Sequence, residues 1–221
     1  MSKDLYDEMF SYVKNLLSES EGTAANTKTW YSFRKRSDHI QRVFMWANRL
    51  IAENTFNRPI DSESVRIAAI FHDVGYAIST ENSPQWEYHA ENSAVIFNRY
   101  ASENNYAGKN PEFVSYLVEN HSRKNLLEDP HTPLELILLV EADLLDETGA
   151  LSIVFDCLAE AGKPEANYFS TYNHVKNFSA KDPANNPMKT AKAKEFWGSK
   201  QKLISEFVNH LEFDLGINEQ R

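Results

Sequence analysis

The sequence predicts an all-α fold, and two observations carry this prediction. Apolar residues recur at three- and four-residue intervals along most of the chain, which is the period of an amphipathic helix. No segment alternates apolar and polar residues as a half-buried strand does. With 221 residues, of which 42% are hydrophobic and 25% charged, the chain is long enough for a full core. We therefore expect a single-domain helical bundle over residues 1–221.

Amphipathic helices are predicted in the first third of the chain. Apolar residues share one face over 5–17, and the polar segment 18–28 that follows is expected to be a loop. A second apolar stripe runs over 40–51. Asp61 is a suitable N-cap for a third helix, whose buried apolar run ends at His72.

The middle third continues the helical pattern. A polar loop is predicted over 79–84 and a helix over about 87–105. Pro111 and Pro133 each open a further helix, because proline is favoured in the first helical turn. The helix after Pro133 is almost wholly apolar and ends in Asp143, so we expect it to be buried.

The last third is less regular. A helix is predicted over about 151–158. The segment 162–187 is rich in Asn, Pro, Lys and aromatic residues, and is expected to be a long loop with short helices inside it. A long amphipathic helix over about 188–213 follows.

Composition excludes several classes of protein. The formal charge of −9 argues against a broad nucleic-acid surface, since phosphate contacts need clustered Lys and Arg. No apolar run approaches the ~20 residues of a membrane span, and the first residues lack a secretion-signal pattern. Cys157 is the only cysteine, so no intrachain disulfide forms. We expect a cytoplasmic protein without a membrane partner.

Four residues are the best candidates for chemistry: His39, the adjacent pair His72 and Asp73, and Asp143. Each lies at one end of an apolar helical segment, so the fold can bring them together in its interior. Imidazoles and carboxylates in one buried cluster are ligands for a hydrolytic divalent transition metal. Two His with two Asp suit Mn, Fe, Co, Ni or Zn better than Ca. A glycine two residues after Asp73 permits the bend that would let both adjacent side chains meet one ion.

The chain resembles the HD-domain superfamily of metal-dependent phosphohydrolases. The resemblance rests on the stretch at 39–43, on AAIFHDVG at 68–75 and on EADLLDETGA at 141–150. It implies an HD-type core over about 30–150 and a C-terminal helical extension over about 151–221. It also implies a metal-activated water that attacks a phosphate ester or anhydride, and nucleotides are frequent substrates of the small stand-alone members.

Two further histidines, His89 and His121, lie at helix positions that can point inward. In some members of the superfamily, two His in this interval hold a second ion, which Asp73 would bridge. The alternative is that both are buried residues that support the site without binding metal. The number of ions, one or two, therefore stays open.

The resemblance leaves the other functional residues to be inferred from spacing. Asp146 lies one helical turn after Asp143, where it would orient a ligand or act, with Asp73, on the metal-bound water. The alternative is that Asp146 is a solvated carboxylate at the helix end. Arg42 follows the ligand His39 by three residues, and Arg123 and Lys124 follow His121. These cations are candidates for binding substrate phosphate, and the alternative is that they are solvated surface charges.

The favoured function is hydrolysis of a small phosphorylated molecule. Two alternatives stay open. Some HD relatives use two irons, held by four His and two Asp, to oxidise a small molecule, and this chain has the same number of candidate ligands. The other alternative is a non-catalytic metal-binding module. The oligomeric state cannot be predicted.

Overall fold

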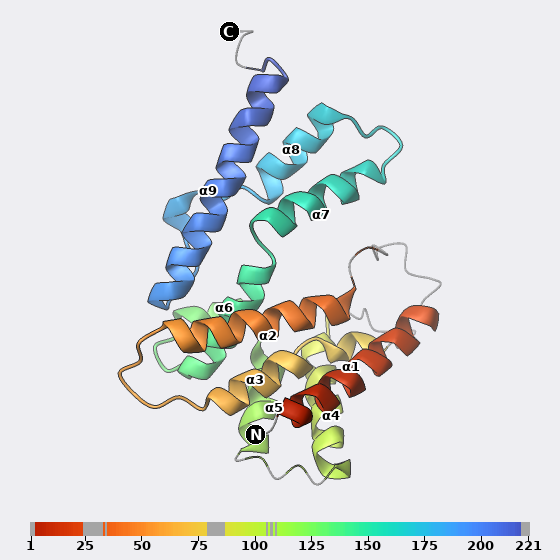
Figure 1. The fold of residues 1–221 in the computed structure, drawn as a ribbon, viewed down its shortest axis with the longest axis vertical. Helices are drawn as coiled ribbons and strands as arrows, with labels where there is room; N and C mark the ends of the chain where they lie inside the picture. The colour runs from red at the N-terminus through yellow and green to blue at the C-terminus, as the bar shows by residue number, and fades with distance from the viewer. Residues whose placement is uncertain are drawn as a thin grey trace. The chain divides into compact units, whose positions relative to one another are not determined.

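The computed structural model describes residues 3–23, 35–78, 87–104 and 110–217, together with Phe33, Tyr106 and Gly108. These residues form α-helices and short 3-10 turns without any strand, which confirms the predicted all-α class (Figure 1). In chain order the elements are α1 (Lys3–Thr23), α2 (Arg36–Glu53), α3 (Ser62–Phe71), η1 (Val74–Ala77), α4 (His89–Glu103), α5 (Pro111–Asn120), η2 (Lys124–Glu128), α6 (Leu134–Asp146), α7 (Ala150–Ala161), α8 (Tyr168–Phe178), η3 (Pro183–Asn185) and α9 (Ala191–Asp214).

The chain forms two compact units, Met1–Asp143 and Leu144–Arg221. The sequence predicts one domain with a C-terminal extension from about residue 151. Whether these two units belong to one domain stays a prediction. Within the described part of the chain, no helix has both the length and the apolar character that a membrane span requires.

Helix α3 is the centre of the first unit. It contacts α1, α2, α4 and α5. Its apolar residues are fully buried all round, as expected of a helix enclosed by others: Val65, Ile67, Ala68, Ala69, Ile70 and Phe71. The predicted N-cap is confirmed, because the Asp61 carboxylate accepts from the backbone N–H of Ser64 at 3.1 Å. The C-terminus of α3 therefore delivers His72 into the interior.

The end of α1 differs from the prediction. The helix continues to Thr23, so the predicted loop is wrong over 18–23. Residues 24–28 of that loop, and the loop predicted over 79–84, lie outside the described residues. The glycine of this segment, Gly22, lowers the stability of a helix by only about 1 kcal/mol, which is not enough to end it. Burial of Met9, Val13 and Leu17 stabilises the preceding turns.

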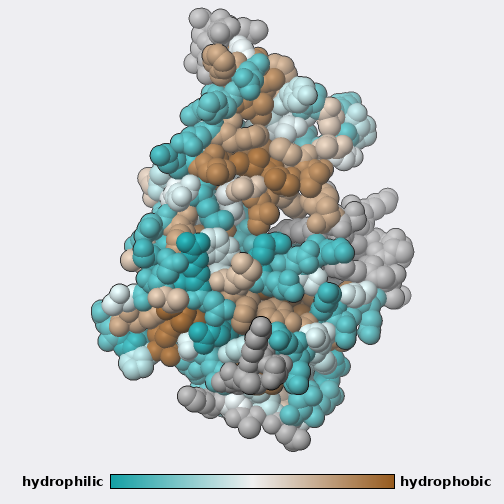
Figure 2. Space-filling view, in the orientation of Figure 1, coloured by the Kyte–Doolittle hydropathy of each residue, from teal (hydrophilic) through white to brown (hydrophobic). Residues whose placement is uncertain are grey.

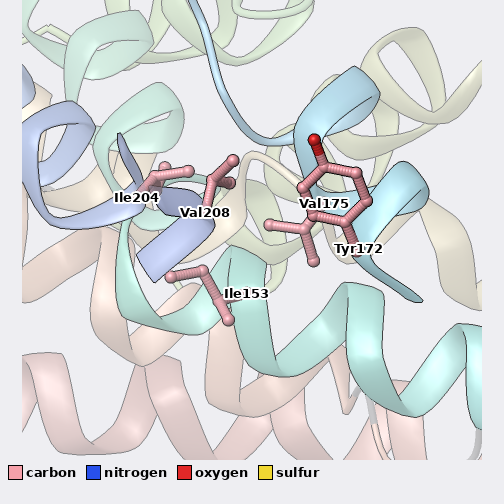
Figure 3. Packing of buried hydrophobic residues seen from close by; sticks show 5 residues of the cluster. All are labelled: Ile153, Tyr172, Val175, Ile204 and Val208. Carbon is pink, nitrogen blue, oxygen red and sulfur yellow. The ribbon is translucent and has the colours of Figure 1, made fainter. Parts of the chain in front are cut away.

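The second unit has a small core of its own, made by Ile153, Tyr172, Val175, Ile204 and Val208 (Figure 3). Apolar side chains also stay exposed along α7, namely Leu151, Val154 and Leu158, and Figure 2 shows apolar surface gathered over α7 and α9.

The segment 162–187, predicted as a long loop with short helices inside it, contains the 11-residue helix α8. Asn167 starts this helix with a capping box. The Asn167 side chain accepts a hydrogen bond from the Ser170 backbone N–H, and the Ser170 hydroxyl accepts one from the Asn167 backbone N–H. The 3-10 turn η3 follows, as a short helix was expected there.

Candidate metal centre

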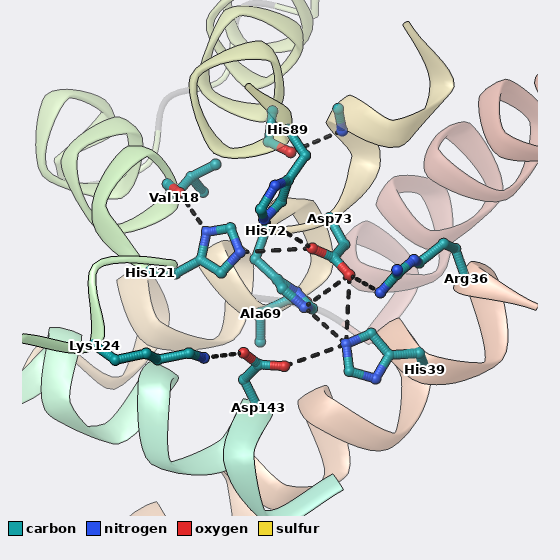
Figure 4. Close-up of polar contacts among 12 residues, drawn as sticks. Arg36, His39, Ala69, His72, Asp73, His89, Val118, His121, Lys124 and Asp143 are labelled. Carbon is teal, nitrogen blue, oxygen red and sulfur yellow. Dashed lines mark hydrogen bonds and ion pairs between the residues drawn. The ribbon is translucent and has the colours of Figure 1, made fainter. Parts of the chain in front are cut away.

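The pair His72 and Asp73 lies where α3 ends and η1 begins. His72 keeps helical backbone angles (φ −55°, ψ −38°), whereas Asp73 leaves the helix (φ −110°, ψ 6°). Two adjacent side chains on a regular helix point about 100° apart and could not both face one ion. The bend at Asp73 removes this obstacle. Both side chains enter the same buried space, as Figure 4 shows.

Hydrogen bonds fix which nitrogen of two histidines faces the centre. The Nδ1–H of His72 donates to the Ala69 carbonyl at 2.9 Å, and the Nδ1–H of His121 donates to the Val118 carbonyl at 2.7 Å. A carbonyl oxygen only accepts, so the proton must lie on Nδ1. The lone pair of each Nε2 is then directed toward the cluster, which is the tautomer that metal binding requires.

The first set of ligand atoms surrounds Nε2 of His39. This nitrogen lies 3.3 Å from Nε2 of His72, 3.3 Å from Oδ1 of Asp143 and 3.4 Å from Oδ2 of Asp73. Bonds of ~2.1 Å to one tetrahedral ion place ligand atoms about 3.4 Å apart. The donor set and its spacing therefore fit a divalent transition metal, and all four residues are buried.

The second set lies at the other oxygen of Asp73. Oδ1 is 3.5 Å from Nε2 of His121 and 3.7 Å from Nε2 of His89. His121 is buried, and the side chain of His89 is 13% exposed. Asp73 thus presents one carboxylate oxygen to each set, which is the arrangement expected of a bridging ligand (Figure 4).

The protonation states suit cation binding. Burial lowers the pKa of His72 to about 4, so its imidazole is neutral at pH 7. Burial opposes ionisation of Asp73, but the Arg36 guanidinium beside it holds the pKa of this carboxyl well below its usual range. Burial likewise opposes ionisation of Asp143, but the Lys124 ammonium beside it holds the pKa of this carboxyl well below its usual range. Neutral imidazoles and ionised carboxylates are the metal-binding forms.

Two cations flank the centre. Nζ of Lys124, one of the predicted substrate-binding residues, lies 2.6 Å from Oδ2 of Asp143. Nη1 of Arg36 donates to Oδ2 of Asp73 at 2.7 Å. Arg36 was not predicted from the sequence, although it precedes His39 by three residues and so shares its helix face.

The remaining predicted residues lie further along the same elements. Asp146 is buried one turn after Asp143 in α6, and its charge counteracts the burial that lowers the pKa of Lys200. Arg42 is half-buried one turn after His39, and Arg123 is exposed at the start of η2. Their catalytic and substrate-binding roles stay predictions.

Comparisons with known proteins agree with this architecture. The family model of the HD domain matches residues 36–148. No curated protein matches the chain. Solved structures that resemble it include an HD-superfamily hydrolase from Bacillus thuringiensis (17% identity, TM-score 0.64, 97% of this chain and 98% of that one) and the Lin1889 protein from Listeria innocua (17%, 0.60, 98% and 99%). A third is Bacillus subtilis YpgQ in complex with ADP (19%, 0.60, 94% and 93%). At these identities the likeness concerns the fold.

Proposed function

The chain belongs to the HD-domain family, and from this premise we propose that it is a phosphohydrolase that cleaves a phosphate ester or anhydride of a nucleotide. The observation that supports this most directly is the Asp73 carboxylate, whose two oxygens face two separate sets of imidazole nitrogens. Family membership makes metal-dependent hydrolysis the expected general chemistry.

Each ligand has a defined place in this proposal. His39, His72, Asp73 and Asp143 would hold one divalent ion, and His89 and His121 would hold a second with Asp73. When bound, such an ion lowers the pKa of water from near 16 to about 7 and neutralises phosphate oxygens.

The protein's own charges would then orient the substrate. Arg36 and Lys124 lie at opposite carboxylates of the centre, so a phosphate that enters between them meets a cation on each side. Arg36 offers a planar fork of N–H donors, whereas Lys124 offers a flexible point charge. Each cation is balanced by a carboxylate, so only together with the bound ions would they offset the overall charge of −9, which would otherwise repel a nucleotide.

The preference for a nucleotide rests on two observations. The small stand-alone relatives that the sequence resembles frequently act on nucleotides. In addition, YpgQ, which shares the fold, was solved in complex with ADP. We carry this substrate class over to the present chain as a proposal.

Metal analysis combined with a substrate screen tests the proposal. Protein purified without chelator is expected to carry close to two divalent ions per chain and to release phosphate or pyrophosphate from a nucleotide. His121→Ala should lower the content toward one ion. The matched control is His210→Ala, because His210 is an exposed histidine of α9. A wild-type protein that binds no divalent ion, or that hydrolyses no nucleotide in any metal form, would contradict the proposal.

A second candidate function is oxidation of a small molecule by a mixed-valent iron pair. The observation that favours it is the gathering of four His and two Asp in one cluster: His39, His72, His89, His121, Asp73 and Asp143. Electron paramagnetic resonance of iron-loaded protein distinguishes the two functions. A mixed-valent signal together with oxygen-dependent turnover would favour the oxygenase, whereas turnover with Mn or Zn without oxygen would favour the hydrolase.

A further inference from the structure

The backbone turn after the metal centre places an aromatic ring beside it. Tyr76 lies three residues after Asp73 in the 3-10 turn η1, and its backbone N–H donates to the Asp73 carbonyl at 3.2 Å. Side chains three residues apart eclipse each other in a 3-10 helix, because that helix has three residues per turn. The Tyr76 ring therefore stands on the same side of the backbone as the carboxylate.

This ring contacts two groups that meet Asp73. The guanidinium carbon of Arg36 lies 4.0 Å from the ring centroid, within range of a cation–π interaction. The imidazole of His89 stacks on the ring with centroids 4.6 Å apart and planes 19° from parallel. Arg36 and His89 approach different oxygens of Asp73, as Figure 4 shows. One side chain thus contacts both the phosphate-binding candidate and a ligand of the second ion.

Close packing fixes the turn that carries this ring. The backbone N–H of Gly75 donates to Oγ of the fully buried Ser93 at 2.7 Å. A Cβ at Gly75 would lie 2.0 Å from the carbonyl oxygen of His89, so only glycine allows η1 to approach α4 this closely. The position of Tyr76 relative to His89 is therefore set by backbone contacts.

We propose that Tyr76 is a positioning residue: its ring holds Arg36 and His89 in the orientations that serve the two oxygens of Asp73. Tyr76 binds neither metal nor substrate in this proposal. It reduces the freedom of the two side chains that do, and so lowers the entropy lost when ion and phosphate bind. The inference rests on the proposed function, because it assumes a second ion at His89.

Replacing the ring tests the proposal. In Tyr76→Leu the affinity for the second ion should fall at least about tenfold, as is typical when a partner that orients a ligand is removed. The first ion should bind as in the wild type, since the ring contacts described above are with Arg36 and His89, and neither is a proposed ligand of that ion. Tyr76→Phe keeps the stacking surface and should bind both ions within about twofold of the wild type. The matched control is Tyr88→Leu, because Tyr88 is 46% exposed and precedes His89 directly.

Titration with Co²⁺, followed by its visible absorption, measures both affinities without reference to turnover. Melting of the metal-free variants checks folding, and Tyr76→Met is the substitute if Tyr76→Leu does not fold. Wild-type protein that binds two ions, with unchanged second-ion affinity in the folded Leu or Met variant, would overturn this inference alone. A loss in Tyr76→Phe as large as in Tyr76→Leu would assign the effect to the hydroxyl and would also overturn it. Binding of only one ion by the wild type would overturn this inference together with the metal pair of the proposed function.

Discussion

Both units of the molecule place histidine beside buried carboxylates, one around Asp73 and the other around Asp156. In the second unit, the Ser179 hydroxyl donates to Oδ2 of Asp156, and Nε2 of His174 lies 3.4 Å from Oδ1. Nδ1 of His174 faces Glu160 at 3.7 Å, and Lys163 pairs with Glu160. In this set, which we call the Asp156 network, the two oxygens of Asp156 face different partners, and so do the two ring nitrogens of His174.

The centre in the first unit has the opposite arrangement. Nδ1 of His72 and of His121 is committed to the backbone, so each Nε2 is directed toward Asp73. Among the described residues, the groups of three or more His, Cys, Asp or Glu side chains whose ligand atoms all lie within 4.8 Å of one another belong to this centre. Convergence of lone pairs, rather than the presence of His and Asp, therefore distinguishes a candidate metal site from a structural polar network.

The largest expected effect separates the two regions by function. Asp73→Ala removes the ligand shared by both sets, so metal content should fall toward zero and kcat/KM at least about a thousandfold, which corresponds to about 4 kcal/mol. Metal analysis and steady-state kinetics measure both quantities, and circular dichroism checks that the helical fold persists. Full metal content in Asp73→Ala would show that the ligand assignment is wrong.

The next effect concerns acid stability without metal. Burial lowers the pKa of His72 to about 4 in the fold, from 6.5 as its ordinary value. Because only the unfolded chain binds this proton between these values, the stability contributed by the neutral imidazole is present above pH 6.5 and is lost as the pH falls toward 4. Lowering the pH from 7 to 5 should therefore reduce the free energy of unfolding by about 2 kcal/mol.

Urea unfolding in a chelator measures this effect. His72→Gln lacks the titrating group and should show a correspondingly smaller pH dependence between pH 7 and pH 5. Equal pH dependence in the variant and the wild type would contradict the prediction.

A smaller effect is expected from Asp156→Asn. The variant keeps the volume but loses the charge that Ser179 and His174 face, and hydrogen bonds to a charged group are worth about 1.5 kcal/mol or somewhat more. The free energy of unfolding should fall by about that amount, while metal content stays that of the wild type. Loss of metal in Asp156→Asn would mean that the contrast between the two regions is wrong.

The smallest effect is expected at the solvent end of the Asp156 network. Lys163 pairs with Glu160, but its side chain is 54% exposed. Exposed ion pairs contribute little because water and salt screen them, so Lys163→Met should leave the unfolding midpoint unchanged within error. A clear drop would show that the network depends on its outer pair as much as on Asp156.

Sequence patterns were sufficient for the helical class and for selecting the histidines and aspartates that the structure brings together at the centre. His39, His72 and Asp143 lie at ends of apolar runs, and the structure brings them together with Asp73. His89 and His121 also meet Asp73, so both lie where a second ion would require them. Whether they bind it stays a prediction.

Two kinds of information were absent from these patterns. Arg36 is the first residue of α2, but the N-cap Lys35 makes no side-chain cap, so no capping residue marks the helix start there. The link between Tyr76, Arg36 and His89 joins separate elements, and such contacts leave no periodic trace in a single sequence. Helix α8 is longer than the short helices expected in its segment, because its capping Asn167 is a residue type that is also common in loops.

The 3-10 turn after Asp73 also makes the spacing of this segment as important as its composition. With three residues per turn, each added or deleted residue rotates the following side chain by about 120°. An insertion between Asp73 and Tyr76 would keep every amino acid of the segment and still direct the ring away from its partners. Distant relatives should therefore be compared first by the length of this segment. A relative with an insertion or deletion there would not direct the residue aligned with Tyr76 toward the same partners.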